Sequence, residues 1–275
     1  MDLYTATSYK ASKLITDSYS TSFGLSIRLF EPALRPHIYA IYGLVRIGDE
    51  IVDTYTGADQ RELLDALEIE TKRAIQSGYS TNPVVHAFAQ TAKEFNITSS
   101  LITPFFKSMR MDLTPQTYDQ KKYETYIYGS AEVVGLMCLK LFVNNKEEYA
   151  FFEPAAKRLG AAYQKVNFLR DIAADADELN RWYFPNSSKE TFDEKTKRAI
   201  VKDIEQDFLA AKSAIDTLPD SSQKAVALSY QYYIGLLNKI KLTPARELLR
   251  KRVRLNDVQK SLFLVKAAIK RKPRV

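Results

Sequence analysis

The sequence has few of the residues on which several fold classes and site types depend. A single cysteine, Cys138, in 275 residues excludes a disulfide framework and any metal or cluster site built from several cysteines, and we expect it to be a small core residue. Two histidines, His37 and His86, exclude a histidine-rich metal centre, and neither lies in the Glu-x-x-His pattern of carboxylate di-iron bundles. Nine glycines and ten prolines are too few turn residues for an all-β fold.

Signals for export, membrane spanning and standard nucleotide binding are also missing. The N-terminal stretch MDLYTATSYKASKL lacks the apolar core of a signal peptide. The most apolar stretch, from Val133 to Val143, contains Lys140 and is too short to cross a bilayer. Neither G-x-G-x-x-G nor G-K-[ST] occurs, so a standard Rossmann or P-loop site is not supported. We therefore expect a cytoplasmic protein.

Positive charge is concentrated at the C-terminal end of the chain. The formal net charge is +7, and residues 250–275 hold ten Lys and Arg against one Asp, which leaves the remainder slightly acidic. A basic end of this kind can face nucleic acid, an anionic lipid surface or a phosphorylated ligand. We interpret the last few residues as a solvated tail and expect no nucleic-acid partner.

Apolar residues recur with helical spacing through most of the chain. Between Ile200 and Ile215 they follow one another at intervals of three and four residues, as on one face of a long helix. Glu31-Pro32 resembles a helix start, and the stretches 123–143 and 155–179 also look like buried helices. The breaks between these stretches are short, and none resembles a domain linker. The pattern predicts one all-α domain over residues 1–275, with about ten helices.

Polar residues in two of these apolar stretches share one helical face. Tyr42, Arg46, Asp49 and Asp53 are spaced by four, three and four residues. Two carboxylates one turn apart can hold a divalent cation that also binds substrate phosphates, since Mg²⁺ is commonly bound by few protein oxygens. One such pair is a weak signal, because two surface acids on an amphipathic helix give the same spacing.

A second stretch repeats the arrangement and makes the signal more specific. Gln164, Asn167, Asp171 and Asp175 are spaced by three, four and four residues. Two such helices facing each other would bring four carboxylates together, and these would repel strongly unless cations lay between them. The pair of motifs predicts a site that binds a diphosphate through Mg²⁺, with Mn²⁺ as an alternative.

These motifs, with others, resemble the squalene/phytoene synthase family of head-to-head prenyl transferases, and most of all a bacterial phytoene synthase. The resemblance covers nearly the whole chain. Where family members commonly have His, Glu, Val and Gly, this sequence has Tyr19, Ala174, Ser130 and Glu132. The matching segments are Ser20-Thr-Ser22-Phe23, Tyr42 to Asp53, Met111-Asp112-Leu113 with Tyr118, Tyr126 to Gly135, Gln164 to Asp175, Arg181-Trp-Tyr183-Phe-Pro185, Tyr233, Arg252-Val253 and Lys260.

The resemblance implies a helical bundle of the isoprenoid synthase type with a central apolar cavity. It implies that two geranylgeranyl diphosphates condense through a cyclopropyl diphosphate to 15-cis-phytoene, a step of carotenoid biosynthesis. Its catalytic residues would be Tyr126 and the four aspartates, and its metal ligands Asp49, Asp53, Asn167, Asp171 and Asp175. The residues expected to bind substrate are Ser20, Ser22, Phe23, Tyr42, Arg46, Gln164, Asn167, Tyr233, Arg252 and Lys260.

Other functions remain open on the sequence alone. Farnesyl diphosphate would give a C30 product instead, but Ser26, Ile27 and Ser130 are modest in size where the far end of the pocket is expected, which favours the C20 substrate. Some relatives of this fold are non-catalytic assembly factors. We expect no NADPH requirement, a monomer or weak dimer, and peripheral contact with the inner face of the cell membrane, into which an apolar product would leave.

Overall fold

Helices make up nearly all the regular structure of the chain. The computed structural model describes residues 1–114, 116–256, 259–260 and 263, and it leaves out the side chains at positions 21 and 22. These residues form no β-strand, only one isolated bridge between Thr117 and Trp182, so the predicted all-α fold is confirmed. In chain order the helices are α1 (Leu3–Tyr19), α2 (Thr21–Ile27), α3 (Arg35–Asp53), α4 (Gln60–Ser77), α5 (Pro83–Glu94), α6 (Ser99–Met111), α7 (Gln120–Ile127), the π-helix η1 (Tyr128–Glu132), α8 (Val133–Phe142), α9 (Lys146–Asp177), α10 (Glu194–Thr217), α11 (Asp220–Leu242) and α12 (Ala245–Leu248).

Polar side chains fix where several helices begin. Each accepts a hydrogen bond from a backbone N–H of the first turn, and that N–H has no hydrogen-bond partner within the helix. The prediction that a helix starts at Glu31-Pro32 is wrong, because α3 begins at Arg35. The backbone N–H of Glu31 instead donates to the carbonyl of Ser221, 2.8 Å away, and holds this turn against α11. The capping residues are Asp2, Ser20, Asn82, Asp119, Asn145 and Asp193.

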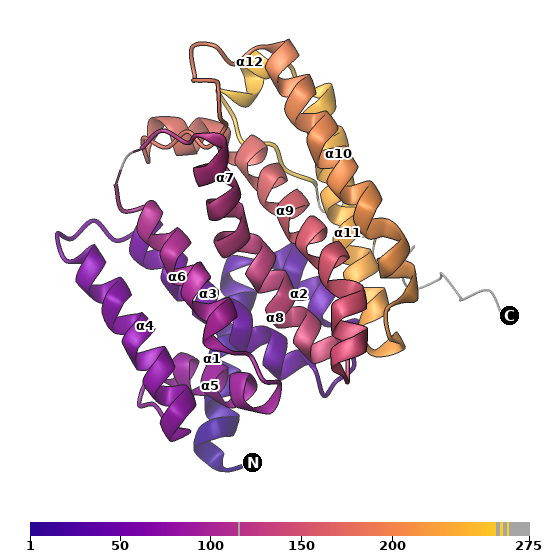
Figure 1. The fold of residues 1–275 in the computed structure, drawn as a ribbon. Helices are drawn as coiled ribbons and strands as arrows, with labels where there is room; N and C mark the ends of the chain where they lie inside the picture. Colours follow the sequence, from indigo (N-terminus) through magenta and orange to yellow (C-terminus); the bar gives the residue numbers. More distant parts are fainter. Residues whose placement is uncertain (115, 257–258, 261–262, 264–275) are drawn as a thin grey trace, which may run out of the picture.

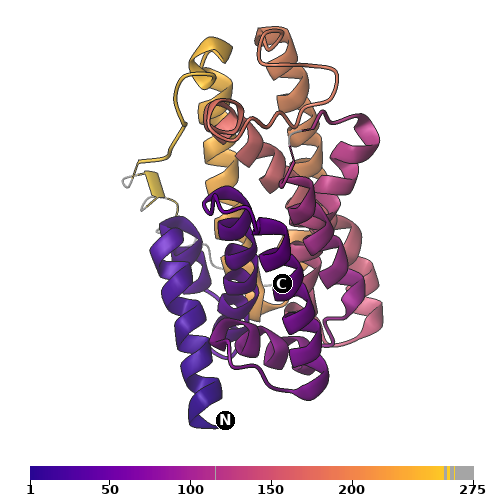
Figure 2. The ribbon, with the colours of Figure 1, turned by 90° about the vertical axis from the view of Figure 1, so that its left-hand side faces the viewer.

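The helices bury two adjoining apolar clusters. One is centred on α3, α5, α6 and α8, and the other on α7, α9, α10 and α11. Figure 1 shows α9, α10 and α11 on one side of the bundle and α1, α4 and α5 on the other, with α7 and α8 between them. Figure 2 shows α1 along the outside of the bundle, next to α3. None of the described helices is both long and apolar enough to cross a membrane.

At one level of their contact, helices α9 and α10 are joined by a group of ion pairs, which we call the charged clamp. The Lys165 ammonium lies 2.5 Å from a carboxylate oxygen of Asp203 and 2.7 Å from one of Asp207. Arg158 contacts the other oxygen of Asp207 at 2.9 Å, and the Asp207 side chain is only 2% exposed. Because a buried charge without a partner is costly, these contacts fix how α9 and α10 pack at this level.

The π-helix η1 packs closely against α9. A Cβ atom added at Gly160 of α9 would lie 2.8 Å from the carbonyl oxygen of Ala131, so only glycine allows this approach. The wider turn of η1 lies inside an otherwise α-helical run, and π-segments of this kind often occur beside functional sites. Ser130 and Ala131 of this turn line the central cavity.

Candidate active site

An apolar cavity of about 260 Å³ lies inside the bundle. Small and apolar residues from α2, α3, η1, α8, α9, α10 and α11 line it, and we call it the chamber. Ser26 and Ser130 line it as predicted, whereas Ile27 does not and is fully buried in the core. Cys138 also lines the chamber, and burial raises the pKa of its thiol to about 12, so it is protonated at neutral pH.

Glu132, the most unusual departure from the family pattern, is absent from the residues that line the chamber. It lies on the side of η1 that faces the charged clamp, where Lys157 and Arg158 favour its charged form and Asp207 opposes it. Burial has the larger effect and raises the pKa of this carboxyl above its usual value. The Glu132 carboxyl therefore adds no charge to the chamber wall.

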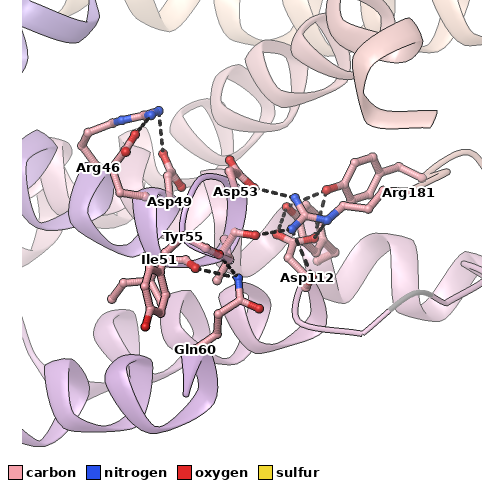
Figure 3. Close-up of polar contacts among 12 residues, drawn as sticks. Arg46, Asp49, Ile51, Asp53, Tyr55, Gln60, Asp112 and Arg181 are labelled. Atoms are coloured by element: carbon pink, nitrogen blue, oxygen red, sulfur yellow. Dashed lines mark hydrogen bonds and ion pairs between the residues drawn. The ribbon is translucent and has the colours of Figure 1, made fainter. Parts of the chain in front are cut away.

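The acidic residues of α3 form one stripe near the chamber. Figure 3 shows Asp49 and Asp53 on the same side of the helix, with Arg46 one turn earlier. The Arg46 guanidinium pairs with Glu50 and lies 3.9 Å from Asp49. Burial, and then the charge of Asp53, raises the pKa of Asp49 to about 7. Without a bound cation, the ionised form of Asp49 is therefore unfavourable in the folded protein.

The acidic residues of α9 form a second stripe. Asp171 pairs with the guanidinium of Arg170 at 2.6 Å and with that of Arg252 at 2.7 Å. No other described residue forms an ion pair with Asp175, and burial followed by the charge of Asp171 raises its pKa to about 8. Asp53 of the other stripe raises it further, which means that the two stripes lie within electrostatic reach of each other.

One arginine joins the two stripes. The Arg181 guanidinium lies 2.5 Å from Asp53 and donates to the carbonyls of Val52 and Asp112 at 2.7 and 3.0 Å. Its backbone N–H donates to the carbonyl of Asp175, 2.7 Å away. Figure 3 shows this guanidinium lying between Asp53 and Asp112. The stripes on α3 and α9 therefore face the same space, and Arg181 spans its edge.

The predicted catalytic tyrosine is held by a buried carboxylate. Tyr126 donates to Asp112 at 2.6 Å, and Tyr183 donates to the other oxygen of Asp112 at 2.9 Å. Burial raises the pKa values of both phenols well above their usual value, so both are protonated. Burial also raises the pKa of Asp112 to about 6, against the effect of Arg181.

The site residues that the sequence analysis did not select are Asp112, Arg170, Arg181 and Tyr183. All four lie in segments that carried the family resemblance, so each was present as a polar residue in a matching motif. Their contacts could not be read from spacing, because Arg181 and Asp53 are separated by 128 residues in the chain.

Aromatic side chains lie where the α3 stripe meets the chamber. Phe23, which lines the chamber, stacks on Tyr42 with ring centroids 5.2 Å apart. Burial raises the pKa of Tyr42 to about 12. Ser20 caps α2 by accepting from the backbone N–H of Phe23 at 3.3 Å, and the side chain of Ser22 lies outside the described part of the structure.

The remaining predicted residues are spread over α9, α11 and the segment that follows α12. The Tyr233 hydroxyl donates to Asn167 at 3.4 Å, and its ring stacks on Tyr163 with centroids 3.9 Å apart. Gln164 is half-buried on the same helix as Asn167. Arg252 reaches the α9 stripe through Asp171, whereas Lys260 contributes a backbone carbonyl, which accepts from Tyr232 at 3.2 Å.

The donor set suits a hard divalent cation. It consists of carboxylate and amide oxygens, the ligands that Mg²⁺ prefers, and two of its carboxyls have pKa values raised by burial and by neighbouring negative charge. A cation between the stripes would compensate that charge. Among the described residues, no three His, Cys, Asp or Glu side chains converge closely enough to enclose a metal by themselves.

Comparison with known proteins gives independent evidence of the family. The family model for squalene/phytoene synthase matches residues 16–259. A phytoene synthase of Arthrospira platensis is 31% identical over 65% of this chain and 61% of its own length. A 4,4'-diapophytoene synthase of Staphylococcus haemolyticus (strain JCSC1435) is 22% identical over 85% of this chain and 87% of its own length.

The fold is shared with solved structures. The crystal structure of a dehydrosqualene synthase in complex with ligand matches with a TM-score of 0.82, at 19% identity, over 96% of both chains. At this identity the likeness concerns the fold alone. The family model, which covers most of the chain, decides the assignment: the chain belongs to the squalene/phytoene synthase family, whose members are prenyltransferases that join prenyl diphosphates head to head.

Proposed function

We propose that this chain is a phytoene synthase. It would condense two geranylgeranyl diphosphates to a cyclopropyl intermediate, prephytoene diphosphate, and convert that intermediate to 15-cis-phytoene with release of diphosphate. The observation that carries the proposal is the pair of facing acidic stripes, joined by Arg181, at an apolar chamber. Charged groups at one end and an apolar wall beyond them suit a diphosphate with a long hydrocarbon tail.

The charged end would bind and release the diphosphates. The metal ligands would be Asp49, Asp53, Asn167, Asp171 and Asp175, and bound Mg²⁺ would neutralise the charge of the departing diphosphate. Arg46 and Arg252 would donate to phosphate oxygens. Lys260 would act in the same way, and Ser20, Ser22 and Gln164 would contribute hydrogen bonds.

The chamber would protect and guide the cations. Ionisation of one substrate gives an allylic cation, and the double bond of the second substrate attacks it. Loss of a proton then closes the cyclopropane ring. The ring faces of Phe23 and Tyr42 can stabilise positive charge, and the apolar wall excludes the water that would quench it. Asp112 holds the Tyr126 hydroxyl in one orientation next to this chemistry.

The composition of the chamber wall supports the longer substrate. Ser26, Ser130 and several alanines line it, and short side chains leave room for a C20 tail. The alternative is farnesyl diphosphate, which would give a C30 product. A non-catalytic assembly factor is disfavoured, because such a protein has no need of four carboxylates facing one space.

Identification of the product by mass separates these functions. Purified protein is given C15 and C20 diphosphates together with Mg²⁺, with or without NADPH, and the hexane extract is analysed. We expect a C40 hydrocarbon that does not change when NADPH is added. A C30 product would contradict the assignment as a phytoene synthase, and the absence of any hydrocarbon under both conditions would support the assembly factor.

A further inference from the structure

The wall of the chamber is thin at one place between α9 and α10. A second hollow, a groove of about 400 Å³ on the outside of the bundle, lies between the same two helices. Ala155 and Ala214 line both the chamber and this groove. Two methyl-bearing side chains are therefore shared by the inner and the outer surface, one from each helix.

The groove is mostly apolar, although Arg158 and Thr217 also line it, and its rims are exposed. Besides the two shared alanines, small residues such as Ala210 and Ser213 line it. Phe151, which also lines it, is 69% exposed, and Leu209, next to Ala210 on α10, is 73% exposed. Large apolar side chains this exposed beside an apolar groove favour contact with another apolar phase.

Helices α9 and α10 are held unequally along their length. The ion pairs of Lys165 with Asp203 and Asp207 fix them at one level, and Arg158, which also pairs with Asp207, reaches into the groove. Around Ala155 and Ala214 the two helices meet through small side chains. Pro154 lies inside α9 at the groove, and it cannot donate the usual hydrogen bond to the carbonyl four residues earlier. The helix pair is therefore easiest to part at the shared alanines.

The chamber must widen to hold its substrates. Its volume of about 260 Å³ is below the roughly 300–1,000 Å³ of pockets that hold a single small ligand. Two long prenyl chains therefore need a wall that can move. The charged end offers a poor way out for a hydrocarbon, because its passage would separate ion pairs such as Arg181 with Asp53 and Arg46 with Asp49.

We propose that α9 and α10 part between Ala155 and Ala214 to form a lateral exit, through which the hydrocarbon product passes into a lipid leaflet lying against Phe151 and Leu209. The inference rests on the proposed function, because only an enzyme that makes a hydrocarbon needs such an exit. The lipid is the fitting occupant of the groove, since only the shared wall at Ala155 and Ala214 separates the groove from the chamber in which the apolar product would form.

The first experiment separates chemistry from release. Ala155→Leu places bulk in the shared wall, and its neighbour Ala156, which lines only the chamber, supplies the matched variant Ala156→Leu. With vesicles present, we expect Ala155→Leu to lower the ratio of the steady-state rate to the single-turnover rate about tenfold, whatever its effect on the chemical step itself, as for a release barrier raised by about 1.4 kcal/mol. A ratio of the two rates that is unchanged in Ala155→Leu, or that falls equally in Ala156→Leu, would overturn the exit.

The second experiment detects contact between the groove and a membrane by fluorescence, and it does not depend on enzyme activity. A cysteine introduced by Ser213→Cys carries an environment-sensitive fluorophore, and Cys138 reacts little because its thiol is buried and protonated. Vesicles of phosphatidylcholine and phosphatidylglycerol should shift this emission to the blue, but not that of a label introduced by Gln76→Cys on the exposed surface of α4. No shift at position 213, or an equal shift at both positions, would contradict the proposal.

The two parts of the account can fail separately. If the wild-type protein forms no hydrocarbon in a single turnover, the proposed function is wrong, whatever the fluorescence shows. If hydrocarbon forms and the Ala155→Leu ratio stays at the wild-type value, the function stands and the lateral exit is wrong.

Discussion

Replacing Asp49 or Asp175 by asparagine lowers kcat by about 10²–10³-fold in the proposed mechanism, the usual effect of removing one group that stabilises developing charge. The fold should not suffer. Burial and neighbouring negative charge raise the pKa of Asp49 to about 7 and that of Asp175 to about 8, so the ionised carboxylates are unfavourable in the folded protein without a cation. The melting temperature without metal should therefore stay the same or rise.

The control for this pair is Asp177→Asn. Asp177 lies two residues after Asp175 on α9 but points to Lys189 and is about half exposed. Its replacement should change neither kcat nor the melting temperature appreciably, because exposed ion pairs contribute little. Near-normal kcat in both Asp49→Asn and Asp175→Asn, measured with saturating Mg²⁺ and substrate, would show that the assignment of these carboxylates is wrong.

Replacing Arg181 by methionine should cost about 3 kcal/mol of unfolding free energy, the scale expected when one partner of a buried charge pair is removed. The change leaves Asp112, which is buried, without its cation, and it frees the carbonyl of Val52. Activity should also fall, because the variant loses the side chain that joins the two acidic stripes.

Two further variants test whether the loss of stability is specific to the guanidinium of Arg181. Arg181→Lys keeps the charge but cannot reproduce the several hydrogen bonds of the guanidinium, so its stability should lie between wild type and Arg181→Met. Arg198→Met, on the exposed face of α10, should stay within about 0.5 kcal/mol of wild type. Urea unfolding measures all three, and wild-type stability in Arg181→Met would contradict the bridging role.

The parts of the site that follow from helical spacing could be predicted from the sequence. Asp49 and Asp53 lie one turn apart on α3, and Asp171 and Asp175 lie one turn apart on α9, so each stripe follows from local geometry. The repeated pattern suggested that the two stripes face each other, and charge repulsion then suggested a cation between them. The contacts of Arg181 with Asp53 and with the carbonyl of Asp175 account for how the stripes are brought together.

Features that depend on distant contacts could not be predicted in this way. The carboxylate of Asp112 orients Tyr126 across a helix boundary, and the direction of Glu132 depends on the turn of η1. The thin wall at Ala155 and Ala214 depends on how two helices pack, which no single stretch of sequence encodes. The extent of the domain over residues 1–275 stays a prediction, as do the cytoplasmic location, the peripheral membrane contact and the monomer or weak dimer.

The central claim is that two acidic stripes hold a diphosphate through Mg²⁺ in front of an apolar chamber. Its most direct test is the affinity for an unreactive thio analogue of geranylgeranyl diphosphate, measured by calorimetry with Mg²⁺ and with EDTA. We expect binding at least about 100-fold weaker in EDTA, and an equal loss in the double variant Asp53→Asn/Asp171→Asn with Mg²⁺. Equal affinity in Mg²⁺ and EDTA, or wild-type affinity in the double variant, would contradict the account.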